Sequence, residues 1–274
     1  MSAKPAAGTP LASQDVRRFL SLLHEPGDVF EVRVPKYGKF KLTASGYFDN
    51  SEAATTAVTR WDGKANIYVT LNSVNPDLLA RAVNRIVDRA DATTADADVL
   101  RRRWLFVDLD AVRPSGISST EAERGAAEDL GGEIEAFLRS QGWPEPIAVM
   151  SGNGTNLLYR VDLPNDPDAN NLVVAVLRRL AERFDNECVK VDTSVSNAAR
   201  IMGLVGTMKM KGDSTEDRPH RRSCVMSAPK RLAIVSRAQL EAVADTQASK
   251  APRPALLVVA RSGGLLTDML DAAG

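Results

Sequence analysis

The chain of 274 residues is long enough to bury a sizeable hydrophobic core, as one large domain or two modest ones. Its hydrophobic content of 44% and charged content of 26% are typical of a soluble globular protein, and 35 basic residues balance 35 acidic ones. The zero net charge excludes a global basic field, so any surface for nucleic acid has to be local. Two cysteines and two histidines, without CxxC or HxxxH spacing, disfavour a structural zinc site.

No apolar leader opens the sequence, and no run approaches the ~20 apolar residues of a membrane span. We therefore expect a cytoplasmic protein with no membrane partner, and the thiols fit a reducing compartment. Composition divides the chain into three parts. Residues 1–13 are small and polar and are expected to be disordered, residues 14–245 form the folded unit, and residues 246–274 form a linker and a C-terminal tail.

The periodicity of apolar residues and the turn signals predict a mixture of helices and strands. In chain order these are a helix at 16–23 capped by Asp15, strands at 29–34 and 39–48 around a turn at 35–38, a helix at 51–60, a strand at 66–71, a helix at 76–89, a strand at 103–110, a helix capped by Ser119 or Thr120 and ending near 140, strands at 147–150 and 157–161, a helix at 170–184, strands at 188–191, 201–207 and 221–226, and a helix at 237–244. The alternation lacks strict βαβ regularity, which indicates the α+β class.

The predicted strand at 103–110 ends in two aspartates, Asp108 and Asp110, separated by one residue. Side chains alternate across a strand, so both carboxylates point to the same face, about 7 Å apart along it. They repel each other and raise each other's pKa unless a cation lies between them. Oxygen ligands of this kind suit Mg²⁺ or Mn²⁺, which complete their shell with water and substrate phosphates. The alternative is a strand that ends in a solvated acidic turn.

A glycine-rich bend, Ser151-Gly152-Asn153-Gly154-Thr155-Asn156, joins two short predicted strands. Glycines let backbone N–H groups turn toward an anion, and Ser151, Thr155 and Asn156 add side-chain donors, so the bend is able to cradle a phosphate. No helix follows it, which excludes a P-loop or a dinucleotide fingerprint. A plain hairpin turn is the alternative.

A third aspartate, Asp192, ends an apolar strand as Asp110 does. It would supply a third carboxylate for a two-metal site; alternatively it is a turn aspartate or a cap.

A basic segment follows, whose positive side chains would bind a triphosphate and a nucleic-acid backbone. Its members are Arg200, Lys209, Lys211, Arg218, His220, Arg221 and Arg222. Because Asp213, Glu216 and Asp217 lie within the segment, a solvated charged loop is the competing interpretation.

The order of these motifs resembles the archaeo-eukaryotic primase superfamily, and more specifically the compact primase–polymerase domains of mobile elements, phages and bacteria. The hallmarks of that family are an Asp-x-Asp on one strand, a Ser-x-His-type second motif and a hydrophobic-Asp third motif. The likeness runs from about residue 28 to about residue 235. It is strengthened by the phrases Gly46-Tyr47-Phe48-Asp49, Ile67-Tyr68-Val69-Thr70-Leu71-Asn72, the run 108–120, Val191-Asp192 with Ala199-Arg200-Ile201, and Lys211-Gly212-Asp213-Ser214 before Arg218-Pro219-His220.

The resemblance implies an RRM-like antiparallel catalytic sheet with helices beside a smaller N-terminal α/β module, and a metal site in the cleft between them. Asp108, Asp110 and Asp192 would hold two Mg²⁺ or Mn²⁺ ions. One ion would lower the pKa of the attacking 3′-hydroxyl and the other would stabilise the leaving pyrophosphate. The implied contacts to nucleotide phosphates or template are Ser151, Asn156, Arg200, Lys209 and Lys211. Substrates would be nucleoside triphosphates and a single-stranded DNA template or primer–template, with a separately encoded helicase as a candidate partner.

Position 156 departs from the family pattern, because it is Asn where the family has His. Asparagine donates a hydrogen bond but cannot carry a positive charge. If this group neutralises developing triphosphate charge, its loss costs on the order of 2–4 kcal/mol unless a neighbouring basic residue compensates. Two alternatives to template-dependent nucleotidyl transfer therefore stay open. One is a catalytically weakened module that binds nucleotide or nucleic acid in replication initiation or regulation. The other is a metal nuclease, disfavoured because no general base is evident.

Overall fold

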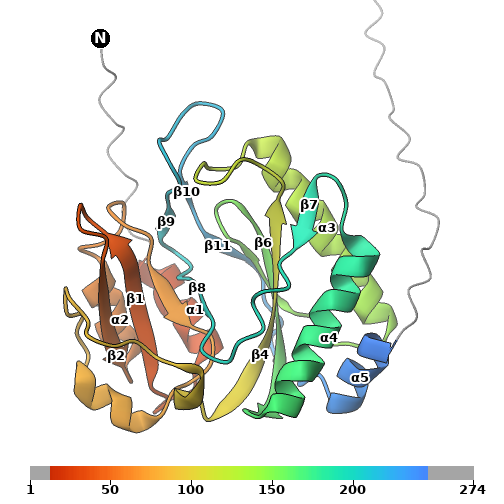
Figure 1. Ribbon diagram of the computed structural model, residues 1–274, viewed down its shortest axis with the longest axis horizontal. Helices are drawn as coiled ribbons and strands as arrows, with labels where there is room; N and C mark the ends of the chain where they lie inside the picture. Colours follow the sequence, from red (N-terminus) through yellow and green to blue (C-terminus); the bar gives the residue numbers. More distant parts are fainter. Residues whose placement is uncertain (1–12, 246–274) are drawn as a thin grey trace, which may run out of the picture.

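Two antiparallel sheets lie side by side and form the body of the molecule (Figure 1). The computed structural model describes residues 13–245. The first sheet has the strand order β2-β1-β3-β8 and belongs to the smaller module. Its strands are β1 (Phe30–Tyr37), β2 (Leu42–Phe48), β3 (Tyr68–Thr70) and β8 (Ile201–Gly203). Helices α1 (Ser13–Leu23) and α2 (Ser51–Val58) complete this module.

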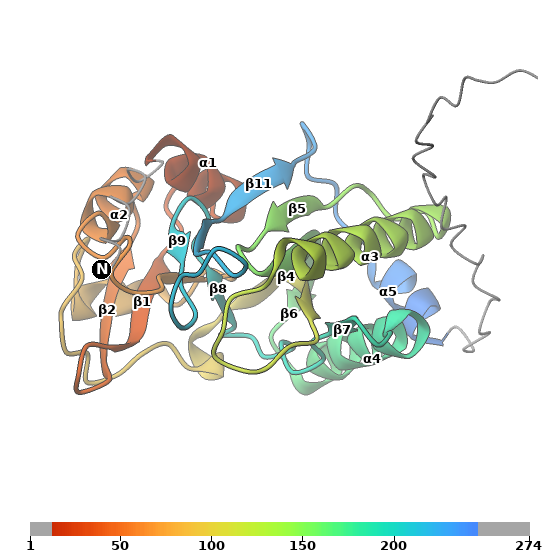
Figure 2. The same cartoon turned by 90° about the horizontal axis from the view of Figure 1, so that it is seen from above.

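The second sheet is larger, with the strand order β11-β5-β6-β4-β7, and every neighbouring pair is antiparallel. Its strands are β4 (Arg101–Ala111), β5 (Ile147–Met150), β6 (Gly154–Pro164), β7 (Val189–Val191) and β11 (Cys224–Ser227). Helices α3 (Glu121–Ser140) and α4 (Pro167–Phe184) cover one face, and α5 (Arg237–Asp245) packs on α4 (Figures 1 and 2). The predicted α+β architecture, an antiparallel sheet with helices beside a smaller α/β module, is confirmed.

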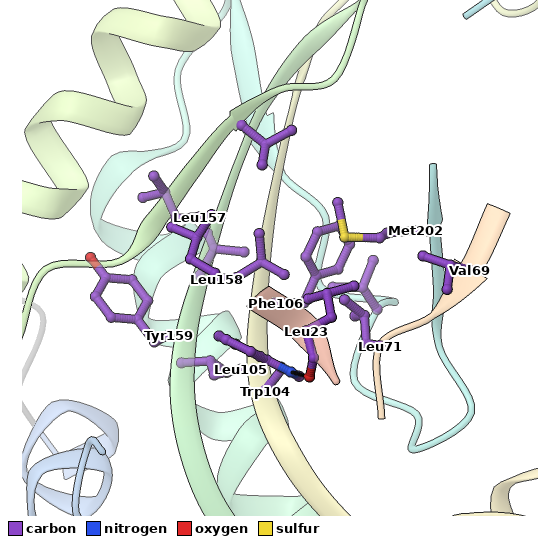
Figure 3. Close-up of a cluster of buried hydrophobic side chains, with 14 of the residues drawn as sticks. Leu23, Val69, Leu71, Trp104, Leu105, Phe106, Leu157, Leu158, Tyr159 and Met202 are labelled. Carbon is purple, nitrogen blue, oxygen red and sulfur yellow. Dashed lines mark hydrogen bonds between the residues drawn. The ribbon is translucent and has the colours of Figure 1, made fainter. Parts of the chain in front are cut away.

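Strand β4 separates two hydrophobic layers because its side chains alternate between the two faces of the sheet. The layer between the sheets contains Leu23, Val69, Leu71, Trp104, Phe106 and Met202 (Figure 3). Leu109 lies on the opposite face, against α3 near Gly131. Asp108 and Asp110 share the face of Phe106, so the strand's period turns both carboxylates toward the first module.

The chain returns to the first module late in the sequence. After β7 it leaves the second sheet and pairs with β3 as the edge strand β8, with Thr70 opposite Ile201. The Leu71 amide extends this pairing by donating to the Arg200 carbonyl at 3.0 Å. This crossing brings Arg200 to the carboxylate-bearing end of β4.

The predicted helix at 76–89 is wrong beyond its first turns. A 3₁₀ helix, η1 (Pro76–Arg81), ends there, and the following segment lies along β2 instead. Val87 and Ser45 exchange two backbone hydrogen bonds, at 2.9 and 3.1 Å. The backbone N–H and C=O groups of this segment therefore bind to the edge of β2, instead of to one another as they would in a helix.

The other predicted elements are present with shifted ends. Thr120 caps α3 in a capping box with Glu123, so Ser119 is not the cap. The turn predicted at 35–38 lies at 38–41, because β1 continues to Tyr37 through a bulge. Helix α1 begins at Ser13, inside the segment predicted to be disordered at 1–13. The rest of that segment, and the predicted linker and tail at 246–274, lie outside the described residues.

The predicted strands at 201–207 and 221–226 are each broken into shorter pieces. The first contains only β8, and the second is divided into β10 (Arg221–Arg222) and β11. Strand β10 pairs with β9 (Met208–Lys209) in a separate two-stranded ribbon. Among residues 13–245, no helix combines the length and the apolar character needed to cross a membrane.

Two glycine substitutions test this fold in opposite directions. A Cβ on Gly46 would lie 1.9 Å from the Arg85 carbonyl oxygen, whereas a Cβ on Gly132 of α3 would meet nothing within 4 Å. Gly46→Ala should lower the free energy of unfolding by on the order of 2–3 kcal/mol, because backbone has to move. Gly132→Ala should raise it by about 0.5–1 kcal/mol through helix propensity. Urea unfolding of both variants measures the difference, and equal effects would contradict the packing of 82–90 on β2.

Candidate active site

A cavity of about 260 Å³ lies where the two sheets and the β9–β10 ribbon meet. Strands β3 and β8 line it from one side, and β4 and β6 line it from the other. All of the predicted site residues line this cavity, namely Asp108, Asp110, Ser151, Asn156, Asp192, Arg200, Lys209 and Lys211. The structure therefore brings the predicted residues together, and their contacts distinguish what each one is able to do.

The three aspartates share one face of the second sheet. Leu109 pairs with Val191 in the antiparallel β4–β7 ladder, which places Asp108 opposite Asp192. The Asp192 amide donates to the Asp108 carbonyl at 2.8 Å and fixes this position. Asp110 is one repeat further along β4, so its carboxylate joins the same face.

Burial and like charge act together on Asp108. Its residue keeps some surface toward the cavity, yet burial of the carboxyl, followed by the charges of Asp110 and Asp192, raises its pKa to about 7. Positive charge is close but not in tight contact. An Arg113 Nη lies 3.6 Å from an Asp110 oxygen, and an Arg200 Nη lies 3.7 Å from an Asp192 oxygen. The cavity wall is thus short of positive charge around its carboxylates.

The donor chemistry at the end of β4 fits a hard divalent cation, because carboxylate oxygens surround one cavity. Within the part of the chain that the structure describes, however, no group of three or more His, Cys, Asp or Glu side chains is gathered closely enough to hold a metal ion. Mutual repulsion favours such separation, since like charges at this depth stay apart without a counterion. The metal site at the three aspartates therefore stays a prediction.

The glycine-rich bend is a hairpin turn between β5 and β6, as its alternative interpretation stated. The Ser151 hydroxyl accepts from the Gly154 amide at 3.0 Å and donates to the Gly154 carbonyl at 3.1 Å. Gly152 has a φ of +96°, which an L side chain rarely adopts. Ser151 therefore holds the turn while it lines the cavity.

Asn156 lies directly opposite Asp108 in the β4–β6 ladder. Its side-chain amide donates to Asp108 Oδ1 at 2.6 Å, and its residue is almost fully buried. This hydrogen bond favours the charged carboxylate and opposes the rise in the pKa of Asp108. Asn156 thus contacts a carboxylate here, whereas the family resemblance implied a phosphate contact.

The ammonium group of Lys209 points into the protein. Its Nζ donates to the Leu204 carbonyl and Thr207 Oγ1 at 2.8 Å each, and to the Ile67 carbonyl at 3.3 Å. Burial lowers its pKa to about 7. With three acceptors already bound, the Lys209 ammonium supports the cavity wall and is not free to contact a phosphate.

The space occupied by the Lys209 side chain depends on two glycines, Gly152 and Gly203. A Cβ on Gly152 would lie 2.7 Å from the Lys209 Cβ, and a Cβ on Gly203 would lie 2.9 Å from its Cε. The lysine stem therefore passes close to both the β5–β6 turn and strand β8. This contact ties the two sheets together at the cavity.

Arg200 and Lys211 are the predicted cations that remain available to a ligand. The Arg200 Nε is buried and, among residues 13–245, has no hydrogen-bond partner, while its Nη groups lie near Asp192. Lys211 is half-buried and lines the cavity. The Arg200 Nη lies beyond hydrogen-bond distance of Asp192, so the guanidinium keeps donor capacity at the cavity.

The rest of the basic segment is engaged by acidic residues or by backbone. Arg218 forms a two-fold contact with Glu123, and Arg221 lies 3.4 Å from Glu121, both at the start of α3. Arg222 pairs with Asp62 at 2.9 Å. A His220 ring nitrogen lies 2.9 Å from the Gly212 carbonyl. These residues anchor the β9–β10 loop. Fewer basic side chains therefore face the cavity than the basic residues of the segment suggested.

Three lining residues were missed as site residues. Tyr68 projects from β3 toward the aspartates, and burial followed by the charges of Asp108 and Asp110 raises its pKa. Asn66 and Asn153 also line the cavity, but the Asn66 amide is bound to the Met210 backbone and the Asn153 oxygen accepts from the Ser119 amide. The sequence did contain a signal for Tyr68. It lies between the buried residues Ile67 and Val69 of the strand predicted at 66–71, so its side chain points to the face of the strand opposite theirs.

The overall fold is similar to two solved structures. One is the AEP domain of the primase–polymerase (PrimPol) of cyanophage S-2L, at 15% identity and a TM-score of 0.49, covering 86% of this chain and 99% of that one. The other is primase RepB′, at 11% identity and a TM-score of 0.47, covering 84% of this chain and 61% of that one. Neither a protein-family model nor a curated protein matches the sequence. With identities and scores this low, function has to be argued from the residues of the cavity.

The pH dependence of stability tests the carboxylate cluster. The pKa of Asp108 is about 7 in the folded protein and about 4 in an unfolded chain. The folded state therefore holds this proton more tightly, and stability falls as the pH rises between these values. Between about pH 4.5 and pH 8 the free energy of unfolding of the wild type should fall by on the order of 2–4 kcal/mol, and Asp108→Asn should abolish this fall. Urea unfolding in EDTA at the two pH values measures the difference. The exposed Asp129→Asn is the control, and parallel pH profiles for wild type and Asp108→Asn would contradict the cluster.

Proposed function

We propose that the cavity is the active site of a template-dependent nucleotidyltransferase of the primase–polymerase kind, acting on nucleoside triphosphates. The observation that carries the proposal is the opposition of charges across the cavity. Asp108, Asp110 and Asp192 lie on one wall, while Arg200 directly precedes β8 and Lys211 follows β9. A triphosphate needs cationic donors for its oxygens, and phosphoryl transfer depends mainly on positioning and electrostatic stabilisation.

The proposal includes Mg²⁺ or Mn²⁺ held by Asp108, Asp110 and Asp192. When bound, such ions neutralise charge on the triphosphate and make a 3′-hydroxyl more acidic. The three carboxylates provide only oxygen ligands, which is the preference of these ions. The raised pKa of Asp108 supports the same assignment, because a carboxylate kept short of positive charge gains from a nearby cation.

The chain's own residues would position the substrate. Arg200 would donate to phosphate oxygens through its guanidinium group, and Lys211 would add a second charge at the same cavity. Asn156 holds the Asp108 carboxylate in one orientation. Ser151 fixes the adjacent turn, and Lys209 braces it from the side of β8. Direct phosphate contact is thus assigned to two of the five residues predicted for it.

A catalytically weakened nucleotide-binding module is the second candidate. Two observations favour it: Asn156 is already bound to Asp108, and the described residues contain no compact metal-ligand group. The two candidates differ in one measurement. A nucleotidyltransferase extends a labelled primer on a single-stranded template when Mg²⁺ or Mn²⁺ is added, whereas the weakened module binds nucleotide without extension.

Removal of the carboxylates should abolish synthesis. Asp108→Ala and Asp110→Ala each remove an oxygen ligand, so incorporation of labelled nucleotide should fall below detection with the fold intact by circular dichroism. Asp192→Asn should lose most of its rate in Mg²⁺ and recover part of it in Mn²⁺, which binds oxygen and nitrogen ligands more tightly. The exposed Asp129→Ala serves as the control. Synthesis at the wild-type rate by Asp108→Ala would exclude the proposed active site.

The cationic wall should control nucleotide affinity. Arg200→Gln removes the guanidinium group and its charge, so kcat/KM for the nucleotide should fall about 10- to 100-fold, which corresponds to the loss of one charged hydrogen bond. Lys211→Gln should have a smaller effect, and Lys209→Gln should lower stability more than nucleotide affinity. Arg139→Gln, on the far helix α3, is the control. Steady-state extension at varied nucleotide concentration measures these effects, and an unchanged KM and kcat in Arg200→Gln would remove it from the site.

A further inference from the structure

A cationic and aromatic surface lies at the tip of the β1–β2 hairpin and the loop that follows α2. Its members, called the hairpin surface below, are Lys36, Tyr37, Lys39, Phe40, Lys41, Arg60, Trp61 and Lys64. We infer that the hairpin surface binds single-stranded DNA and leads it to the active-site cavity. The inference rests on the proposed function, because it names the surface that would hold the template of that site.

Phe40 stands at the tip of the hairpin with 79% of its surface exposed. The exposed ring is accessible to an unstacked base, which offers it a flat partner. Within residues 13–245, no hydrogen bond or ion pair engages the ammonium groups of Lys39 or Lys41 on either side of it. Basic side chains next to an aromatic ring are the combination that binds single strands, through phosphate contacts and base stacking.

The backbone of the tip is held in an unfavourable conformation. Lys36 and Lys41 have φ values of +53° and +49°, a region that lysine rarely adopts. Lys36 also lies in the bulge where the register of β1 against β2 shifts between Val34 and Tyr37. Strain of this sort is concentrated at functional sites, and here it exposes Phe40 between two lysines.

An aromatic pocket of about 410 Å³ lies at the base of the hairpin. Tyr37 and Trp61 meet edge-to-face in it, with ring centroids 4.7 Å apart. The Arg60 guanidinium lies 4.8 Å from the centroid of the Trp61 ring and also pairs with Asp88. Lys64 completes the lining. Trp61 itself is buried, so what the pocket offers a strand is the half-buried Tyr37 ring beside the positive charges of Arg60 and Lys64.

The hairpin surface and the active-site cavity are lined by adjacent residues of the chain. Ala65 lines the aromatic pocket, and the next residue, Asn66, lines the cavity. The Asn66 amide is fixed by two hydrogen bonds with the backbone of Met210, at 2.6 and 2.8 Å. Met210 precedes Lys211, so the loop after α2 and the ribbon form one rigid connection. In Figure 1 the red β1–β2 turn and the β9–β10 ribbon both lie toward the upper side of the molecule.

The charge of the surface matches a polyanion. Asp88 and Asp91 lie on the neighbouring segment, which pairs with β2 through Ala90 and Thr43, and Asp88 is occupied by Arg60. Asp62 is occupied by Arg222 and the Met208 amide. Positive charge therefore exceeds negative charge on this face, although the whole chain is neutral. Because the net charge of the chain is zero, a surface for nucleic acid has to be local, and the hairpin surface is such a local basic surface.

Fluorescence anisotropy with a labelled oligothymidine strand tests the inference. Phe40→Ala should weaken binding roughly tenfold, which is the effect of losing one stacked base. Lys39→Gln with Lys64→Gln should make the slope of log affinity against log salt shallower by about 1.4, because two phosphate contacts are lost. The matched control combines Lys230→Gln, Arg231→Gln and Ile234→Ala, which are exposed residues between β11 and α5. The control should bind as the wild type does.

Several outcomes would overturn the assignment. Wild-type affinity and salt slope in the hairpin variants would do so, as would a Phe40→Ala variant that changes only the oligomeric state in gel filtration. Tighter binding of duplex DNA or of oligouridine than of oligothymidine would show that the surface does not prefer single-stranded DNA, and would overturn the assignment. Failure of the proposed function is seen separately, as intact strand binding by a wild-type protein that incorporates no nucleotide with Mg²⁺ or Mn²⁺.

Discussion

The half-buried carboxyl group of Asp108, whose pKa is raised to about 7, is the constraint on which the rest of the cavity depends. The period of β4 places Asp110 on the same face, and the antiparallel ladder places Asp192 directly opposite. The backbone ladder fixes the face from which all three carboxylates project, because the other face of the sheet carries the hydrophobic layer under α3. The surroundings must therefore supply donors or positive charge. Asn156 supplies a hydrogen bond at 2.6 Å, while the cations stay near 3.7 Å.

The arrangement of the two sheets answers that need with residues that are distant in sequence. After β7 the chain leaves the second sheet and joins the first as β8, which carries Arg200 to the open end of β4. Lys209 then fixes the ribbon, because its stem passes between Gly152 and Gly203 and its ammonium binds three acceptors. Burial of that ammonium opposes its charge and lowers its pKa to about 7. The three hydrogen bonds offset part of this cost and hold the two modules in a fixed relation.

Local patterns predicted those parts of the molecule that local physics decides. The strand period predicted one face for Asp108 and Asp110, and the capping sequence at Thr120 predicted the start of α3. The segment 82–89 has helical periodicity, but the edge of β2 offers it backbone partners that no local pattern reveals. Asp192 could be proposed from its strand, whereas its position opposite Asp108 depends on a register between β4 and β7 that only the fold establishes. The placement of the site was thus predictable, and its contacts were not.

The two lysines of the ribbon show why counting charges misjudges the cavity. Lys209 and Lys211 are equivalent in the sequence, but the protein binds the ammonium of the first and leaves the second at the cavity. Arg218, Arg221 and Arg222 are likewise neutralised by acidic residues of α3 and the loop after α2. Among the lining residues, three carboxylates therefore face only Arg200 and Lys211 as available cations. A triphosphate alone gains little from such a wall, so under the proposed function the substrate has to bring divalent cations with it, and the same carboxylates that repel the triphosphate would then bind it.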